Sequence, residues 1–380
     1  MLQLEGRTAY TSDHDFFRDL VRKFLAREFA PHFDRWERQG IVDRDFWLAC
    51  GNAGLLCPTV PEEYGGAGLD FRYNAVIAEE IGYFGAIAGT SLQSDVIVDY
   101  VVKHGTEEQK RRHLPRMVTG ELITAIAMTE PNAGSDLQAL RTTARRDGSS
   151  YVINGAKTFI SNGQSADLII VVAKTTPEGG SKGTSLFLVE ASRTGFKRGR
   201  NLDKIGQFSG DTSELFFDNV VVPAGSLLGA ENAGFGMLMK QLPQERLSIA
   251  ICAQAAAQRA FDEAVSYTKD RKAFGKRIFD LQHTRFTLAD LATKLQVGWA
   301  HLDWALLRHV EGKLTASEAA AAKYWHTEMQ WQVVDAALQL HGGAGYMNEC
   351  TIARLWRDAR AQRIYGGTSE IMREVIGRTL

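Results

Sequence analysis

The C-terminal part of this chain lacks the residues that normally interrupt helices. The last proline of the 380 residues is Pro243, so the final 137 contain none, and only three glycines lie between Met237 and His341. Sixteen glycines lie between Gly120 and Gly236. Glycine and proline are the strongest local breakers of regular structure. We therefore expect long helices after Met237 and a turn-rich segment before it, which disfavours an all-β chain and a simple Rossmann fold.

The hydrophobic pattern divides the chain into three parts. Apolar residues at helical spacing fill the first third, starting with a helix that we expect Asp13 to cap and Pro31 to end. Short β-rich runs follow from Glu121, and Asn154-Gly155 predicts a tight hairpin turn between two of them. Strong helix formers dominate after Gly236, over a length sufficient for a four-helix bundle. The expected α+β, mostly α chain has an N-terminal helical domain (residues 1–120), a middle antiparallel β-domain of barrel or sandwich type (121–232) and a C-terminal four-helix bundle (233–380).

Composition argues against several classes of protein. The 44 Lys and Arg residues are balanced by 45 Asp and Glu, unlike a nucleic-acid binder or a polybasic membrane anchor. No apolar run approaches the ~18 residues that a transmembrane helix needs. The acidic N-terminus resembles neither a signal peptide nor a transit sequence. The four cysteines lack zinc-site spacing, so we expect free thiols, no metal and a cytoplasmic location.

The common nucleotide-binding and hydrolase motifs are absent from the sequence. It contains no G-x-G-x-x-G, P-loop, G-x-S-x-G or H-E-x-x-H pattern. Four polar, glycine-rich segments are nevertheless too unusual to be plain connections. Each alone is compatible with a helix cap or a tight turn, but together they indicate a shared function. They comprise residues 129–136, 271–276, 339–346 and 363–370.

Five ordered motifs give the chain a resemblance to the acyl-CoA dehydrogenase family of flavoproteins. They are AMTEPNAGSD, FISNG, RKAFGK, QLHGGAGY and IYGGTSEI, and the resemblance runs from about Asp13 to the C-terminus. It implies the three-part fold above, one FAD per subunit, and a homotetramer in which a neighbouring subunit helps to bind each FAD. It also implies an oxidoreductase of fatty acid β-oxidation that removes two hydrogens from an acyl-CoA, leaves a trans-2-enoyl-CoA and passes the electrons to electron-transfer flavoprotein.

The resemblance also implies a position for the catalytic carboxylate. In many family members the base lies in the last motif, but this chain has Gly366 there. Either the chain is inactive, or the base occupies the alternative position of the long-chain and isovaleryl types, which matches Glu245 in QLPQERL. We expect Glu245 to take the α-proton while a hydride leaves the β-carbon for flavin N5, and the N–H of Gly366 to bind the thioester oxygen. A solvated helix glutamate paired with a cation is the alternative for Glu245. Ser135, Arg246 and Gly367 are further expected substrate contacts.

FAD contacts are carried over from the family motif by motif. The matched residues are Met128, Thr129, Gly134 and Ser135 for the flavin and pyrophosphate; Phe159, Ile160 and Ser161 beside the flavin ring; Arg271, Phe274, Gln282, Gln339, Leu340, Gly342 and Gly343 for the FAD of a neighbouring subunit; and Thr368, Ser369 and Glu370 on the adenine side.

The motifs are compatible with more than one acyl group in the substrate. QLPQERL and IYGGT favour a long-chain acyl-CoA, and a branched-chain or isoprenoid-type acyl-CoA is the second candidate. An acyl-CoA oxidase on the same scaffold, or a non-catalytic relative that binds partners, is also compatible with the motifs. Small residues between positions 84 and 100 would give a roomy acyl pocket, but they equally permit close helix packing.

Overall fold

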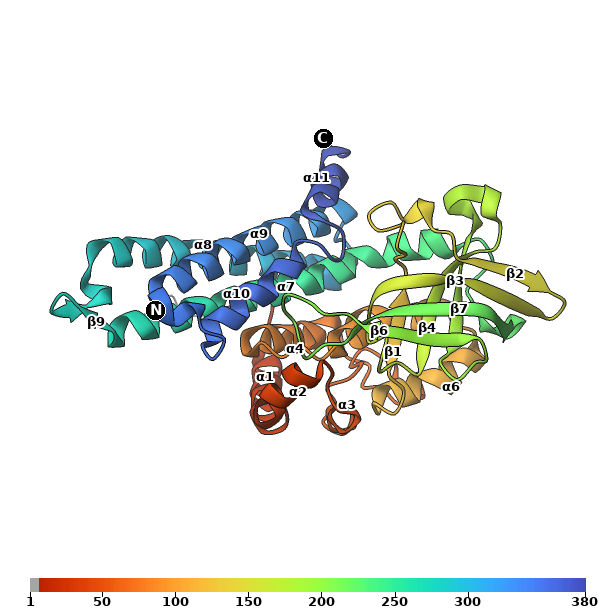
Figure 1. Cartoon of the computed structure of the whole chain (residues 1–380), viewed down its shortest axis with the longest axis horizontal. Helices are drawn as coiled ribbons and strands as arrows, with labels where there is room; N and C mark the ends of the chain where they lie inside the picture. Colours follow the sequence, from red (N-terminus) through yellow and green to blue (C-terminus); the bar gives the residue numbers. More distant parts are fainter. Residues whose placement is uncertain (1–6) are drawn as a thin grey trace.

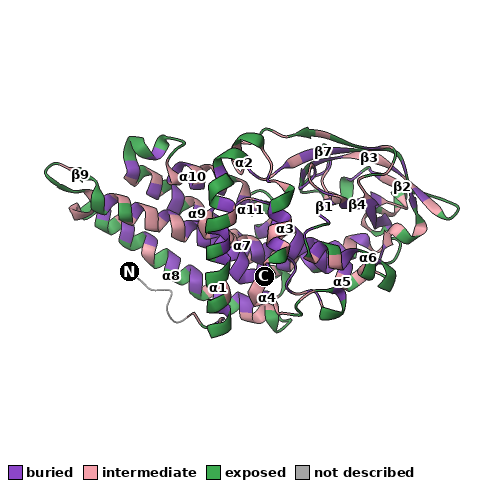
Figure 2. Ribbon diagram, turned by 90° about the horizontal axis from the view of Figure 1, so that it is seen from below, coloured by how far each residue is buried: buried purple, intermediate pink, exposed green. Residues whose placement is uncertain are grey.

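The computed structural model describes residues 7–380 (Figure 1). A sheet forms one end of the molecule and a helical bundle the other, with the N-terminal helices between them on one side. Helix α7, Gly234–Asp270, runs through the molecule from the sheet to the far end of the bundle. Figure 2 shows that α7 is mainly buried, whereas the outer faces of α1 and α2 are exposed. Within residues 7–380 no helix combines the length and apolar character needed to cross a membrane.

The N-terminal third is helical, as the sequence predicts. Its first helix, however, begins at Ser12 with Thr11 as the N-cap. Asp13 therefore lies in the first turn, where its negative charge interacts favourably with the helix dipole. Pro31 does not end the helical path. It lies in a single 3₁₀ turn, Ala30–His32, where its missing N–H costs little, and the chain continues as α2. The α-helices are α1 Ser12–Phe24, α2 Phe33–Gln39, α3 Arg44–Asn52, α4 Phe71–Phe84, α5 Val98–His104 and α6 Glu107–Val118.

The middle part forms one eight-stranded sheet. Its order is β6-β7-β3-β2-β4-β5-β8, with β1 beside β4. The sheet is mixed, whereas an antiparallel one was predicted, because β1 and β2 both run parallel to β4. The strands are β1 Thr124–Ala127, β2 Thr143–Asp147, β3 Ser150–Ser161, β4 Leu168–Lys174, β5 Thr184–Glu190, β6 Phe196–Asn201, β7 Thr212–Pro223 and β8 Leu227–Leu228.

The hairpin predicted at Asn154-Gly155 is wrong. Both residues lie inside β3, whose pairing with β7 shifts register between Ile153 and Gly155. Such a bulge absorbs the irregular backbone without ending the strand. The turn into β3 is instead made at Gly148, whose φ of +58° suits glycine.

The C-terminal part is a bundle of four helices. Three were predicted, and the fourth, α10, was not; the helix predicted after Thr368 is α11, which packs on α9. Between α7 and α8 the chain forms a small hairpin at the end of the bundle remote from the sheet (Figure 1). The elements are α8 Gln282–Val310, α9 Ala316–His341, α10 Thr351–Gln362, α11 Ser369–Gly377, β9 Lys272–Ala273 and β10 Lys276–Arg277.

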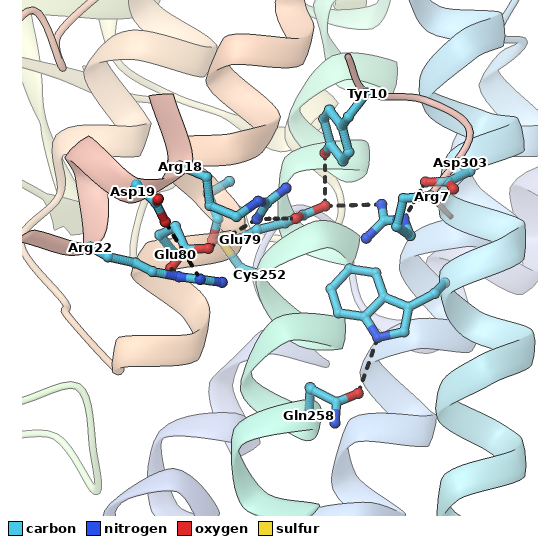
Figure 3. A network of polar contacts seen from close by, with 12 residues as sticks. Arg7, Tyr10, Arg18, Asp19, Arg22, Glu79, Glu80, Cys252, Gln258 and Asp303 are labelled. Carbon is cyan, nitrogen blue, oxygen red and sulfur yellow. Dashed lines mark hydrogen bonds and ion pairs between the residues drawn. The ribbon is translucent and has the colours of Figure 1, made fainter. Parts of the chain in front are cut away.

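A buried ion-pair network connects the N-terminal segment to α4 and α8. Glu79 accepts hydrogen bonds from Arg7 at 3.0 Å and from the Tyr10 hydroxyl at 2.7 Å, and it pairs with Arg18 at 2.6 Å (Figure 3). Arg7 also contacts Asp303 of α8 at 2.5 Å. These cations hold the pKa of Glu79 below its usual range although burial alone would raise it.

Helix α4 also lies very close to α7. A Cβ added to Gly82 would lie 2.6 Å from the backbone oxygen of Cys252, so only glycine permits this approach. Cys252 and the other three cysteines are free thiols, as predicted. The contact places the segment that follows α4 alongside the first half of α7, where Glu245 lies.

Candidate active site

Glu245 lies in the first half of α7 with its side chain buried. Its Oε1 accepts a hydrogen bond from the hydroxyl of Tyr100 in α5 at 3.2 Å. Burial raises the pKa of Glu245 to about 7 because the charged form loses its water, while Tyr100 and Arg246 act in the opposite direction. The carboxyl is therefore a buried group, not the solvated helix glutamate of the alternative. A buried carboxyl with a pKa near 7 has the properties of a general base.

The loop that contains Gly366 meets α7 one helical turn after Glu245. Gly366 has φ +65° and Gly367 φ +96°, conformations that glycine adopts most easily. A Cβ on Gly366 would lie 2.4 Å from Cδ1 of Ile249. Residues i and i+4 of a helix share one face, so Ile249 and Glu245 are neighbours on α7. The structure thus brings the two predicted catalytic residues into one region.

Lys323 of α9 fixes this loop, although the sequence interpretation did not single it out. Its Nζ donates to the Gly367 oxygen at 2.6 Å. Burial and, to a smaller extent, the nearby Arg246 lower the pKa of Lys323 to about 8. Arg246 is itself buried, its Nε has no hydrogen-bond partner within residues 7–380, and burial lowers its pKa. The predicted substrate contacts Arg246 and Gly367 therefore lie in an electropositive region that favours a negatively charged oxygen.

The first two predicted FAD segments also lie together. Thr129, just after β1, donates from Oγ1 to the Thr158 oxygen at 2.5 Å, and the Thr158 N–H donates back to the Thr129 oxygen at 3.0 Å. The next residue, Phe159, has φ +59° and is 69% exposed, because the β3–β7 register shifts between Lys157 and Ile160. Ile160 is buried and packs into the sheet core.

The residues around Phe159 provide space and polar groups at the surface. Met128 is half-buried, and Gly134, Ser135 and Ser161 are exposed. A Cβ on Gly134 would meet no atom within 4 Å. A planar ring could therefore lie over Phe159 with hydroxyl groups and free backbone beside it.

Part of the third predicted set lies at the end of the molecule opposite the sheet (Figure 1). Arg271 and Phe274 belong to the β9–β10 hairpin, and Phe274 is 93% exposed. His341, which was expected to be structural, is buried, stacks on Tyr267 and lies 2.7 Å from the Ala337 oxygen. This stacking places the start of the glycine segment beside the end of α7 that leads into the hairpin, whereas β3, which contains Phe159, lies in the sheet at the other end of the molecule (Figure 1). The remaining members of this set are the exposed Gln282, Gln339 and Gly343 and the half-buried Leu340.

The predicted adenine-side residues differ in accessibility. Thr368 caps α11 by accepting from the N–H of Ile371 at 3.3 Å. Ser369 is buried and donates to Glu328 at 2.6 Å. Glu370 has an exposed side chain. The hydroxyls of Thr368 and Ser369 are thus used within the chain, and Glu370 is the most accessible of the three.

Family models for acyl-CoA dehydrogenases match almost the whole chain. The N-terminal domain model matches residues 11–121, the middle domain model 125–220 and the C-terminal domain model 232–380. The chain belongs to the acyl-CoA dehydrogenase family. It is an enzyme of the FAD-dependent oxidoreductase class, as the sequence predicted.

Individual relatives agree with the family models. The long-chain specific acyl-CoA dehydrogenase of Sus scrofa mitochondria is 48% identical over 377 residues, which are 98% of this chain and 88% of that protein. The isovaleryl-CoA dehydrogenase of Solanum tuberosum mitochondria is 37% identical over 96% of this chain and 89% of its own length. The crystal structure of an acyl-CoA dehydrogenase from Geobacillus kaustophilus superposes with a TM-score of 0.97 at 48% identity and covers 98% of this chain and 99% of that one.

The cofactor of this acyl-CoA dehydrogenase is FAD. A glutaryl-CoA dehydrogenase of Mycobacterium smegmatis, solved in complex with FADH2, has a TM-score of 0.92 at 27% identity and covers 99% of this chain and 96% of that one. The present residues fit such a group, since the exposed ring of Phe159 offers a flat face and the open side of Gly134 leaves the backbone accessible.

Proposed function

We propose that this enzyme dehydrogenates long-chain acyl-CoA thioesters in fatty acid β-oxidation, with Glu245 as the base. The observation that carries the proposal is the buried carboxyl of Glu245 on the same face of α7 as the Gly366 loop. The 48% identity to a long-chain specific relative supports the chain-length preference.

The chemistry assigned to this chain is a proton transfer in a dry site. The Glu245 carboxylate accepts the α-proton and becomes a neutral carboxylic acid, which suits its buried position. The electron pair released at the α-carbon is stabilised in part by the thioester oxygen, to which the Gly366 N–H donates, and it forms the Cα=Cβ bond as the hydride leaves the β-carbon. Bound FAD would supply the hydride acceptor. Arg246 and Lys323 add positive charge near the loop that binds this oxygen.

We further propose that each FAD is shared between subunits of a homotetramer. Met128, Thr129, Gly134, Ser135 and the segment 159–161 contact it from one subunit. The hairpin residues and the segment 339–343 contact it from a neighbour, and the segment 368–370 contacts its adenine side. Electron-transfer flavoprotein is the proposed acceptor, on the basis of the family resemblance.

The base assignment is tested with a Glu245→Gln variant. Bleaching of the flavin by acyl-CoA without oxygen should slow by about 10²–10⁴-fold, the usual contribution of a general base, while FAD remains bound. Glu263→Gln is the matched control, because Glu263 lies on the same helix, half-buried and paired with Arg259 at 2.7 Å outside the site. Full turnover by the Glu245→Gln variant would disprove the assignment.

Substrate and electron acceptor need separate measurements. A rate series over acyl chain length and branching distinguishes a long-chain enzyme from a branched-chain or isoprenoid-type one, for which the 37% identity to an isovaleryl-CoA dehydrogenase is the supporting observation. Admission of air after bleaching distinguishes a dehydrogenase from an oxidase, since rapid reoxidation with release of peroxide indicates the latter. A non-catalytic relative would show no bleaching with any acyl-CoA.

A further inference from the structure

Tyr100 lies beside the proposed base and is almost fully buried, at 1% exposure. Its hydroxyl donates to Oε1 of Glu245 at 3.2 Å. Within residues 7–380 neither of these two side chains has another hydrogen bond. Burial of a tyrosine hydroxyl is costly without a partner. The Tyr100 hydroxyl is thus directed at a charged group in the site, although an ordinary core position would be filled equally well by phenylalanine.

The segment that precedes Tyr100 is joined to α7 by a buried polar cluster centred on Asp95. Asp95 belongs to the π-helical segment Leu92–Ile97 and accepts hydrogen bonds from Ser248 at 2.7 Å and Asn74 at 2.8 Å. Gln244, which precedes the base, donates to the Asp95 backbone oxygen at 2.6 Å. These contacts fix the segment against α7 on both sides of Glu245.

A second set of contacts lies next to Tyr100 itself. Asp99 accepts from Lys103 at 2.7 Å and from Gln241 of α7 at 3.2 Å, and Lys103 also donates to Gln241 at 3.1 Å. Gln241 lies one helical turn before Glu245. The backbone that carries Tyr100 is therefore tied to the turn of α7 that leads into the base, so the phenol oxygen has a defined position relative to the carboxylate.

We propose that Tyr100 is a positioning residue for the base: its hydroxyl donates to one oxygen of Glu245 and leaves the other free to accept the α-proton. The proposal rests on the assignment of Glu245 as the base. It adds that the reactivity and orientation of the carboxylate depend on a phenol from the N-terminal domain. At 3.2 Å the bond is long for an O–H···O contact, so its restraint on the carboxylate is weak.

Tyr100 remains a donor at every pH at which the enzyme works. Burial and the negative charge of Glu245 raise the pKa of Tyr100 well above its ordinary value of 10, so the phenol keeps its proton. Donation stabilises the charged form of the carboxyl and lowers the pKa of Glu245. Removal of the hydroxyl should therefore raise that pKa, so that less of the enzyme carries the ionised base at a given pH below it.

Other ionisable groups near the pair are the same in wild type and variant. Burial raises the pKa of Asp95 to about 7 as well, and it lowers the pKa of His309, which contacts Gln244 at 3.1 Å, to about 4. The charged or titratable groups on the elements packed around the pair include Asp95, Asp99 and Lys103 from the N-terminal domain, Arg246 from α7, His309 from α8 and Lys323 from α9. Only the difference between the two pH profiles is therefore assigned to Tyr100.

The test compares kcat/KM of wild type and Tyr100→Phe across pH with a long-chain acyl-CoA. We expect the acidic limb, near pH 7 in the wild type, to move upward by about one pH unit, and kcat/KM below the limb to fall about tenfold. Tyr83→Phe is the matched control, because Tyr83 donates to Asp262 of α7 at 2.9 Å away from the base. It should leave the limb in place. Thermal unfolding and flavin content verify that each variant is folded and loaded.

The outcomes separate this inference from the proposed function. An acidic limb of Tyr100→Phe that coincides with the wild type, with or without a change in KM, overturns the positioning role and leaves Tyr100 as packing or pocket lining. An equal shift in Tyr83→Phe overturns it too, since the effect would then be general. If Glu245→Gln retains turnover, the base assignment itself fails; if Glu245→Gln is inactive but Tyr100→Phe has no shift, only the present inference fails.

Discussion

At Gly366 a single carbon atom determines whether the proposed thioester-binding loop can lie against α7. A Gly366→Ala variant places Cβ 2.4 Å from Cδ1 of Ile249 and must keep φ +65°. The left-handed conformation alone costs an alanine roughly 1–2 kcal/mol, and displacement of the proposed N–H donor should lower kcat by about 10²–10³-fold. Steady-state kinetics and thermal unfolding of the variant measure the two effects.

Two further variants identify the cause of that loss. Gly377→Ala, in α11, meets no atom within 4 Å and should change neither activity nor stability appreciably. Ile249→Val removes Cδ1, so in combination with Gly366→Ala it should restore part of the activity, while the strain at φ +65° remains. Wild-type kcat in Gly366→Ala would show that this backbone donor is not needed.

At the scale of single residues, the sequence predicts a role only for residues that lie inside a recognisable motif. Glu245 and Gly366 were predicted because the motifs around them are specific, and the structure places them on neighbouring surfaces. Tyr100 and Lys323 were not assigned roles, because their contacts with Glu245 and Gly367 join segments far apart in the chain. The sequence did contain one signal of this arrangement. Glu245 and Ile249 are four residues apart, and this spacing predicts that they share one face of the helix.

Among the helices, the contact between α4 and α7 depends most on one glycine. Alanine at Gly82 would place Cβ 2.6 Å from the Cys252 oxygen and 3.0 Å from its Cα, and backbone atoms cannot move aside cheaply. We expect Gly82→Ala to lower the free energy of unfolding by about 1–3 kcal/mol, despite the better helix propensity of alanine. Urea denaturation measures this change. Gly236→Ala, at an open position in the first turn of α7, is the control and should be neutral or slightly stabilising.

Two errors in the sequence prediction of elements have physical causes. Asn-Gly favours a hairpin turn, but β3 pairs with β7 over twelve residues, and this long ladder continues through the dipeptide with a bulge. Helix α10 was missed although Ile352, Leu355 and Ala359 have helical spacing and are buried. Its glycine-rich approach, residues 342–346, had been interpreted only as a binding segment. The long helices α7, α8 and α9 were predicted because strong helix formers dominate their sequences, and α7 continues through its one proline, Pro243.

At the scale of the whole molecule, α7 separates two groups of proposed FAD contacts. Its N-terminal end lies at the sheet, whose strand β3 contains Phe159, and its C-terminal end leads into the β9–β10 hairpin with Arg271 (Figure 1). The helix has 37 residues, and at ~1.5 Å per residue it is about 55 Å long. We therefore expect the two groups to contact one FAD only from different copies of the chain.

Replacement of Arg271 tests this arrangement directly. Arg271→Ala should weaken FAD binding by about 10–100-fold, the loss of one charge-assisted hydrogen bond to phosphate, and leave the fold of each chain unchanged. Arg277→Ala on the same hairpin is the control, because Arg277 pairs with Asp280 at 2.7 Å and has no proposed cofactor role. Flavin-to-protein ratios after gel filtration, with the oligomer size from the same run, provide the measurement. Unchanged FAD affinity in an intact Arg271→Ala oligomer would contradict the shared site.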